Sequence, residues 1–216
     1  ELADLDITKE PMEVGPTTHY IMGGIRVDAD TQESTIPGLF AAGECAAGIN
    51  GANRLGGNSL SDLIVFGKRA GEYASQYARK AGVTKVNEDA VERAIKESLA
   101  PFDRGAQGEN PYKVQQDLQD TMQDLVGIVR TESEMQEAVK RLAAFRERAS
   151  RVGVEGHREF NSGWHTCIDL RNLLDCSELI AVSAIERKES RGGHFRSDYP
   201  DAGAQSRSFL SQASLP

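Results

Sequence analysis

Residues 51–60 read Gly51-Ala52-Asn53-Arg54-Leu55-Gly56-Gly57-Asn58-Ser59-Leu60. This glycine-rich loop runs directly into a segment whose apolar residues recur at spacings of three and four, which predicts a helix to about Lys80. The N-terminus of a helix carries free backbone N–H groups and a partial positive charge, and both attract anions. The stretch therefore predicts a site for a carboxylate, a phosphate or an anionic ring, with Arg54 as a bidentate donor to a carboxylate.

Spacing alone leaves a second interpretation of this stretch open. Glycines mark turns in many proteins, so residues 51–60 also fit a plain turn that carries a surface arginine. The helix that follows is better defined: Asn58, Ser59 or Ser61 can cap its start, and Gly82 can end it. Three small residues leave a smooth stripe for close packing on a sheet: Gly67, Ala70 and Gly71.

The segments before residue 51 have strand-like composition. Residues 17–21 and 25–27 flank Met22-Gly23-Gly24, which predicts a tight hairpin. Residues 38–42 form a short apolar run that stops at Gly43-Glu44, as a buried strand does when it ends at a site loop.

Beyond Gly82 the pattern changes, and we expect a bundle of amphipathic helices. One helix begins after Asn87, a second begins at Asn110-Pro111, and residues 131–134 form a capping box that opens a third. A last helix is expected over residues 167–190, ending at Gly192-Gly193. Its expected buried residues are Leu170, Leu173, Leu174, Ile180, Ala181 and Ala184.

Composition excludes several classes of protein. With 216 residues, 39% hydrophobic and 27% charged, the chain can fold around a core, and a formal net charge of -8 argues against a nucleic-acid partner. No apolar run approaches the roughly 18 to 20 residues that cross a bilayer. The three cysteines lack metal-ligand spacing, so we expect no metal site. The sequence starts at Glu1 in what reads like the middle of a domain, so we expect a fragment or a processed product.

Three motifs in order, residues 19–25, 38–45 and 51–60, resemble consecutive motifs in the flavoprotein subunits of succinate dehydrogenase and fumarate reductase. Residues 169–173 and 186–200 also resemble the C-terminal domain of that family. The resemblance spans nearly the whole chain.

The resemblance implies an α+β fold: the C-terminal part of a split FAD-binding, Rossmann-like domain, followed by a helical bundle domain. We therefore expect residues 1–82 to belong to the FAD-binding domain, residues 83–199 to form the bundle, and residues 200–216 to be a mobile tail. In the intact enzyme, the family binds FAD, passes electrons to an iron–sulfur subunit, and is held by a membrane anchor. The implied location is peripheral, on the inner face of the cell membrane.

For the site, the resemblance implies that His19 and Arg54 bind the carboxylates of succinate or fumarate. It implies that Glu44 hydrogen-bonds the ribityl or ribose region of FAD, and that Ser59 and Leu60 approach the flavin ring. The plainer interpretations are a hydrogen-bonded strand histidine at His19 and a solvated loop carboxylate at Glu44. His157, His165 and Cys167 are interpreted as structural, and His194 and Arg196 as domain-docking residues.

Other motifs of the family are not found in this sequence: the phosphate-binding glycine fingerprint, the histidine that carries covalent FAD, and the arginine that shuttles the proton. We therefore expect no catalytic proton-transfer residue here and no activity from these 216 residues alone. The loop to Arg54 is also a residue shorter than is common, with Asn50 where histidine is frequent. Two alternatives remain: an L-aspartate oxidase-like flavoenzyme, which should lack the Leu55–Asn58 and Arg191–His194 patterns, and a folded module without catalytic activity.

Overall fold

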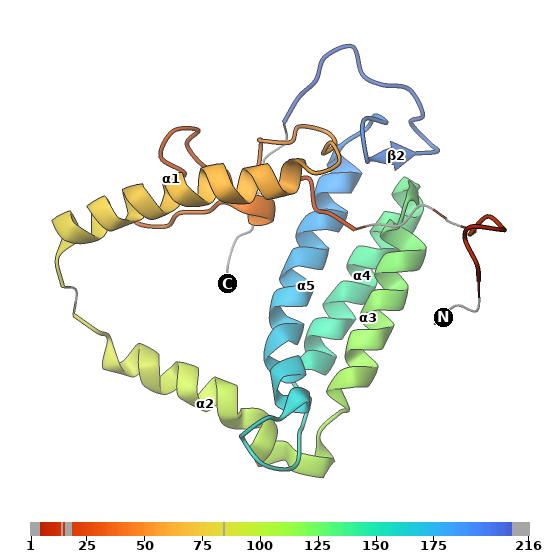
Figure 1. Ribbon diagram of the computed structural model, residues 1–216. Coiled ribbons are helices and arrows are strands. Elements are labelled where there is room, and N and C mark those ends of the chain that lie inside the picture. Colours follow the sequence, from red (N-terminus) through yellow and green to blue (C-terminus); the bar gives the residue numbers. More distant parts are fainter. Residues whose placement is uncertain (1–4, 14, 16–18, 84, 209–216) are drawn as a thin grey trace.

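The computed structural model describes residues 5–13, 15, 19–83 and 85–208, and its regular structure is mostly helical (Figure 1). The helices are α1 (Asn58–Ala81), α2 (Glu88–Arg104), α3 (Pro111–Val126), α4 (Glu132–Ala149) and α5 (Ser162–Glu186), with 3-10 turns η1 (Gly43–Cys45) and η2 (Gly105–Gln107). Strands β1 (Val129–Arg130) and β2 (Phe195–Arg196) pair in parallel. No helix in this part of the chain is long and apolar enough to cross a membrane.

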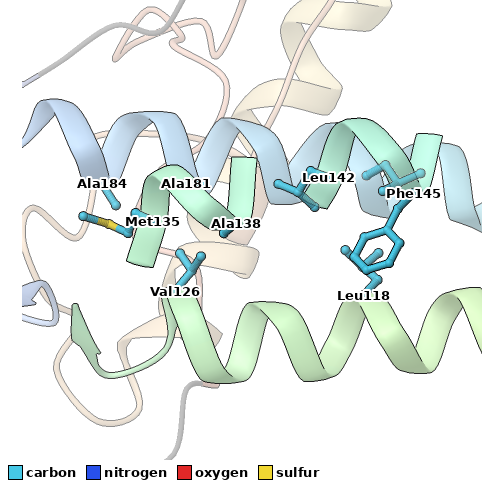
Figure 2. Packing of buried hydrophobic residues seen from close by; sticks show 9 residues of the cluster. Leu118, Val126, Met135, Ala138, Leu142, Phe145, Ala181 and Ala184 are labelled. Atoms are coloured by element: carbon cyan, nitrogen blue, oxygen red, sulfur yellow. The ribbon is translucent and has the colours of Figure 1, made fainter. Parts of the chain in front are cut away.

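Helices α3, α4 and α5 lie side by side and form the predicted bundle (Figure 1). Figure 2 shows their apolar faces meeting in one core. The buried residues of this core are Leu118, Val126, Met135, Ala138, Leu142, Phe145, Leu174, Ala181 and Ala184. Burying a large apolar side chain stabilises a fold by about 1.5 to 3 kcal/mol, so this core is the main source of stability in the helical part.

The predicted starts of α2, α3 and α4 are confirmed. The side chain of Asn87 accepts from the third residue of α2, and that of Asn110 accepts from the second and third residues of α3. Thr131 Oγ1 accepts from the Glu134 backbone N–H at 3.4 Å, which is the first half of a capping box. Glu134 returns the contact by accepting from Thr131 Oγ1 at 2.6 Å.

Helix α2 contributes less to the bundle than its pattern indicates. Its N-terminal end lies away from α5, and its C-terminal half makes the contacts with α5 (Figure 1). Trp164 at the start of α5 donates from Nε1 to the backbone oxygen of Ser98 at 2.6 Å, and its ring lies 5.4 Å from that of Phe102. Farther toward the start of α2, Val91 and Ile95 are exposed.

The predicted bounds of the last helix are wrong at both ends. Asn161 accepts from Trp164 N–H and caps the helix before the expected start at Cys167. The helix ends at Glu186, because Arg187 adopts extended backbone angles (φ -81°, ψ 96°) instead of continuing to the glycine pair. Of the residues expected to be buried, Leu173 is 37% exposed and Ile180 is only partly buried against the core.

Helix α1 follows its predicted span, but its start is different. Gly57, with a left-handed φ of 82°, occupies the capping position and no side chain caps the helix, so Asn58 already lies in the first turn. Gly82 ends the helix as predicted. Close packing of its small-residue stripe on a sheet is not seen among the described residues, because Gly67 and Gly71 have open space beside them.

The predicted hairpin over residues 17–27 is wrong for its described part; residues 17 and 18 lie outside it. Ile25 instead pairs with the segment around η1: its N–H donates to Cys45 O at 2.8 Å, and its carbonyl accepts from Ala47 N–H at 2.9 Å. Gly24 allows this pairing, since a Cβ there would lie 2.4 Å from Cys45 O. The glycine serves a close approach between segments rather than a turn.

The strand expected over residues 38–42 is present only as a single bridge. Phe40 forms one isolated antiparallel bridge with Glu33, so no continuous strand is present. Ala41 is nevertheless buried, at 5% exposure, as a residue before a site loop should be.

Residues 187–203 form a segment that folds back onto the bundle after α5. Arg196 is fully buried and pairs with Asp198 and Glu132, and its guanidinium also donates to the carbonyl of Ile185 at 2.9 Å. Gly203 N–H donates to Glu189 at 2.8 Å, which ties the far end of the segment to its beginning. The division of the chain near residue 82 and the mobility of residues 200–216 stay predictions.

The ion pair at Asp198 predicts an acid-sensitive contribution to stability. Hydrogen bonding to Arg196 lowers the pKa of Asp198 to about 2, below the ordinary value of about 4. A carboxyl whose pKa is lowered by folding stabilises the fold above its ordinary pKa, and this contribution is lost as the pH falls toward about 2.

We therefore expect Asp198→Asn to lower the free energy of unfolding at pH 7 by roughly 1 to 2 kcal/mol, and the difference from the unmodified protein to close between about pH 5 and pH 2. Urea unfolding at several pH values measures this difference. The exposed Glu137→Gln is the control and should change little. A difference that stays constant with pH would contradict the assignment.

Candidate functional site

His19 and Arg54, separated by a long stretch of sequence, meet in the structure. Arg54 Nη2 lies 3.3 Å from His19 Nε2. The Arg54 guanidinium carbon lies 4.5 Å above the ring centroid of Tyr20, and Nη1 donates to Leu55 O at 3.3 Å. The loop before α1 therefore places Arg54 next to the segment that contains His19.

The Arg54 guanidinium is held but its charge is not paired. Among residues 5–13, 15, 19–83 and 85–208, the guanidinium contacts Leu55 O and His19 but forms no ion pair, and its buried Nε has no hydrogen-bond partner. A partly buried cation without a counterion is costly, and an anion that accepts its free donors removes that cost. The pair is therefore suited to bind a carboxylate between an arginine and a histidine.

Glu44 supports this arrangement from η1. Its Oε1 accepts from the backbone N–H of Ile21 at 3.0 Å, which holds the His19–Ile21 segment beside the loop. The pairing of Ile25 with Cys45 and Ala47 fixes the same two segments farther along. One carboxylate oxygen of Glu44 is therefore occupied within the chain, and Oε2 is left for another donor.

Ser59 and Leu60 lie where the loop becomes helix α1, as the sequence predicts. Leu60 is 65% exposed and Ser59 is half-buried. A Cβ placed at Gly56 or Gly57 would meet nothing within 4 Å, so the approach to this helix start is open. An open, glycine-rich helix N-terminus flanked by exposed apolar surface can receive a flat ring that becomes negative.

Three residues that sequence reasoning did not assign complete the site: Tyr20, Asn50 and Asp62. Asp62 is 4% exposed, its Oδ1 has no partner, and its Oδ2 accepts weakly from Asn50 at 3.5 Å. The pKa of the Tyr20 phenol is raised by desolvation, and further by the negative charges of Asp62 and Glu44. Tyr20 could have been found from its place next to His19, whereas Asp62 reads in the sequence as an ordinary acid near the start of a helix.

Comparison with known proteins shows the family and the fold. Residues 115–214 match the sequence family described as "Fumarate reductase flavoprotein C-term", and residues 1–60 match the family described as "FAD binding domain". The chain is 43% identical to the fumarate reductase flavoprotein subunit of Haemophilus influenzae, over 89% of this chain and 32% of the relative. It is 38% identical to the succinate dehydrogenase flavoprotein subunit of Coxiella burnetii, over 93% of this chain and 36% of the relative.

A solved structure of the Mycobacterium smegmatis Sdh1 complex in the apo form superposes with a TM-score of 0.87 at 57% sequence identity, covering 94% of this chain and 34% of that chain. The chain therefore spans about a third of the length of the relatives it matches. The family expected from the three motifs, and its C-terminal region in particular, is confirmed.

Proposed function

This chain belongs to the family of succinate dehydrogenase and fumarate reductase flavoprotein subunits, and from that premise we propose that it supplies part of an FAD-dependent site that interconverts succinate and fumarate. The observation that carries the proposal is the unpaired Arg54 guanidinium beside His19. The activity of the whole protein, its substrate and its partners are proposed by similarity, since the chain covers about a third of its relatives.

Arg54 and His19 bind the substrate carboxylates in this proposal. Arg54 presents a planar pair of donors, which match the two oxygens of a carboxylate, and His19 adds a donor beside it when its Nε2 carries a proton and turns from Arg54 to the carboxylate. Tyr20 supports the guanidinium from below through its ring face. The charge of the dianion is thereby balanced at a fixed position, which orients the carbon that reacts.

The residues present fit FAD, the cofactor of this family. The open glycines Gly56 and Gly57 at the start of α1 leave room for a flat ring beside the helix N-terminus. Glu44 Oε2 would accept from a ribityl or ribose hydroxyl, and Ser59 and Leu60 would lie against the flavin ring. When bound, FAD would supply the hydride-transfer chemistry. The helix N-terminus favours the reduced, negative form of the ring.

No residue of this chain is assigned to the proton transfer. The partners proposed are an iron–sulfur subunit, which takes or supplies the electrons, and a membrane anchor, which places the flavoprotein peripherally on the inner face of the cell membrane. An aspartate oxidase-like activity is not favoured, because the Leu55–Asn58 and Arg191–His194 patterns are both present. A module without catalytic activity is the remaining alternative.

An absorbance spectrum with an intact-mass measurement tests the proposal. We expect the 216 residues alone to hold no stoichiometric FAD, because no glycine fingerprint in them binds its pyrophosphate. We expect the protein as purified from its source to be yellow and to show a longer polypeptide mass. Colourless native protein would favour the non-catalytic module, and stoichiometric flavin on the 216 residues would refute the expected division of the flavin site.

A further inference from the structure

The turn at residues 191–194 touches the loop that carries Arg54. Gly193 N–H donates to the carbonyl of Ala52 at 3.0 Å. Gly192 lies even closer: a Cβ built on it would be 2.1 Å from Ala52 O and 2.8 Å from Ala52 Cβ. Its φ of 62° is also in the left-handed region that favours glycine. The contact therefore depends on a glycine at position 192.

The turn is closed by its own backbone. Arg191 N–H donates to His194 O at 2.8 Å, and His194 N–H donates to Arg191 O at 3.1 Å. The Arg191 guanidinium pairs with Glu189 and donates to Gly203 O, so both sides of the turn are tied to the rest of the segment. The Arg191–His194 turn that contacts Ala52 is therefore held in one conformation by these hydrogen bonds.

His194 attaches this turn to the helical bundle. Its Nδ1 lies 2.8 Å from Nη1 of Arg130, the second residue of β1, and its Nε2 lies 3.2 Å from the carbonyl of Arg187. One residue beyond, β2 pairs with β1, and the buried Arg196 bonds to Asp198 and Glu132. The bundle therefore holds the turn through charged and backbone contacts on both sides.

We infer that the Arg191–His194 turn is a positioning element of the dicarboxylate site, which holds Ala52 and thereby sets the position of the Arg54 guanidinium. The inference rests on the proposed function, because it takes Arg54 to bind a carboxylate. Ala52 lies two residues before Arg54, and the loop between Gly48 and Gly57 is rich in glycines that permit many backbone conformations. A loop of that kind keeps its shape when a rigid neighbour holds it.

This arrangement gives the bundle a role in the chemistry of the site. A misplacement of about 1 Å in a group that orients substrate can lower the rate about a hundredfold. A Cβ at position 192 cannot fit beside Ala52 O, so either the turn or the loop must move. Because Arg54 lies only two residues after Ala52, its two donors then meet the substrate carboxylate at the wrong angle.

Gly192→Ala in the native holoenzyme tests this inference, with two matched controls. Gly193→Ala keeps the N–H donor and places its Cβ 4.0 Å from Ala52 O, so it fits. Gly105→Ala adds a side chain at a positive φ of 48° with open space around it, so it tests a side chain at a positive φ without the contact. Titration with malonate, a dicarboxylate that cannot be oxidised to an alkene, is followed by the flavin absorbance.

We expect Gly192→Ala to weaken malonate binding about tenfold or more, with unchanged flavin content, and both controls to bind within about twofold of the unmodified protein. A Gly192→Ala protein that binds malonate like its controls would overturn the inference. Arg54→Lys distinguishes failure of the proposed function from failure of the inference about the turn. If both Arg54→Lys and Gly192→Ala bind malonate normally, the proposed carboxylate role of Arg54 is wrong. If only Arg54→Lys binds malonate weakly, the positioning role of the turn alone is wrong.

Hydrogen exchange in the unmodified holoenzyme gives an independent test should Gly192→Ala fold poorly. Coupling between two sites is reciprocal, so malonate must stabilise the Gly193–Ala52 contact if that contact favours malonate binding. We expect saturating malonate to slow exchange of the Gly193 amide severalfold, with no change at the Gly105 amide. Equal exchange at Gly193 with and without malonate would overturn the inference.

Discussion

Arg54→Lys, made in the native flavoprotein, is expected to lower kcat/KM for succinate oxidation about a hundredfold or more while FAD stays bound. Lysine keeps the positive charge but loses the planar pair of donors, so a carboxylate held by two parallel hydrogen bonds keeps at most one of them. Each charge-assisted bond is worth roughly 1.5 to 3 kcal/mol, and displacement of the reacting carbon adds to the loss. Lysine also loses the flat contact with the Tyr20 ring.

The flavin should remain because its contacts within this chain are assigned to Glu44, Ser59 and Leu60 and not to Arg54. Arg69→Lys is the matched control: Arg69 lies on α1, is 44% exposed, and donates to a backbone carbonyl at 3.2 Å. Steady-state rates and the flavin-to-protein absorbance ratio are measured for both variants. Near-normal kcat/KM in Arg54→Lys would show that the dicarboxylate is held elsewhere.

Arg196→Met is expected to cause the largest loss of stability, about 3 to 5 kcal/mol in the free energy of unfolding. The Arg196 side chain is fully buried, and its guanidinium bonds to Asp198, Glu132 and the carbonyls at the end of α5. Methionine fills much of the same space but donates no hydrogen bond, so Asp198 and Glu132 both lose the guanidinium that pairs with them. Since a domain has only about 5 to 15 kcal/mol to lose, the native state would become marginal.

Urea unfolding at pH 7 measures this loss, and Arg141→Met provides the comparison. Arg141 pairs with Glu137 one turn away on α4 and is half exposed, so its replacement should change stability by no more than about 0.5 kcal/mol. If both variants unfold at the same urea concentration, the buried network does not hold the segment after α5 as described.

Local signals decided how much of the fold could be predicted from the sequence. Helix starts at Asn87, Asn110 and Thr131 were found because a capping side chain acts on backbone groups two or three residues away. The end of α5 was missed because Gly192 serves a contact with Ala52, far away in sequence, and not the helix end. The hairpin was predicted wrongly for the same reason, because Gly24 serves a contact with Cys45 and not a turn. Glycines mark special backbone positions, but sequence alone does not say which neighbour requires them.

The residues of the candidate site were likewise predicted only in part. His19 and Arg54 were predicted together through the family motifs, and the structure places them 3.3 Å apart, although their roles stay proposals. Glu44 was assigned to the cofactor alone, whereas its Oε1 also holds the Ile21 backbone. Asp62 was not predicted, since a buried acid whose Oδ1 lacks a partner is recognised only once the fold brings Asn50 and Tyr20 beside it.

The central claim is that Arg54 and His19 together hold a dicarboxylate. A crystal structure of the native flavoprotein with malonate bound tests it most directly. The result we expect is one malonate carboxylate bonded to both guanidinium donors of Arg54 and to His19 Nε2, next to the start of α1. Malonate bound at a different place, with the Arg54 guanidinium still resting on Tyr20 and Leu55 O as it does here, would contradict the claim.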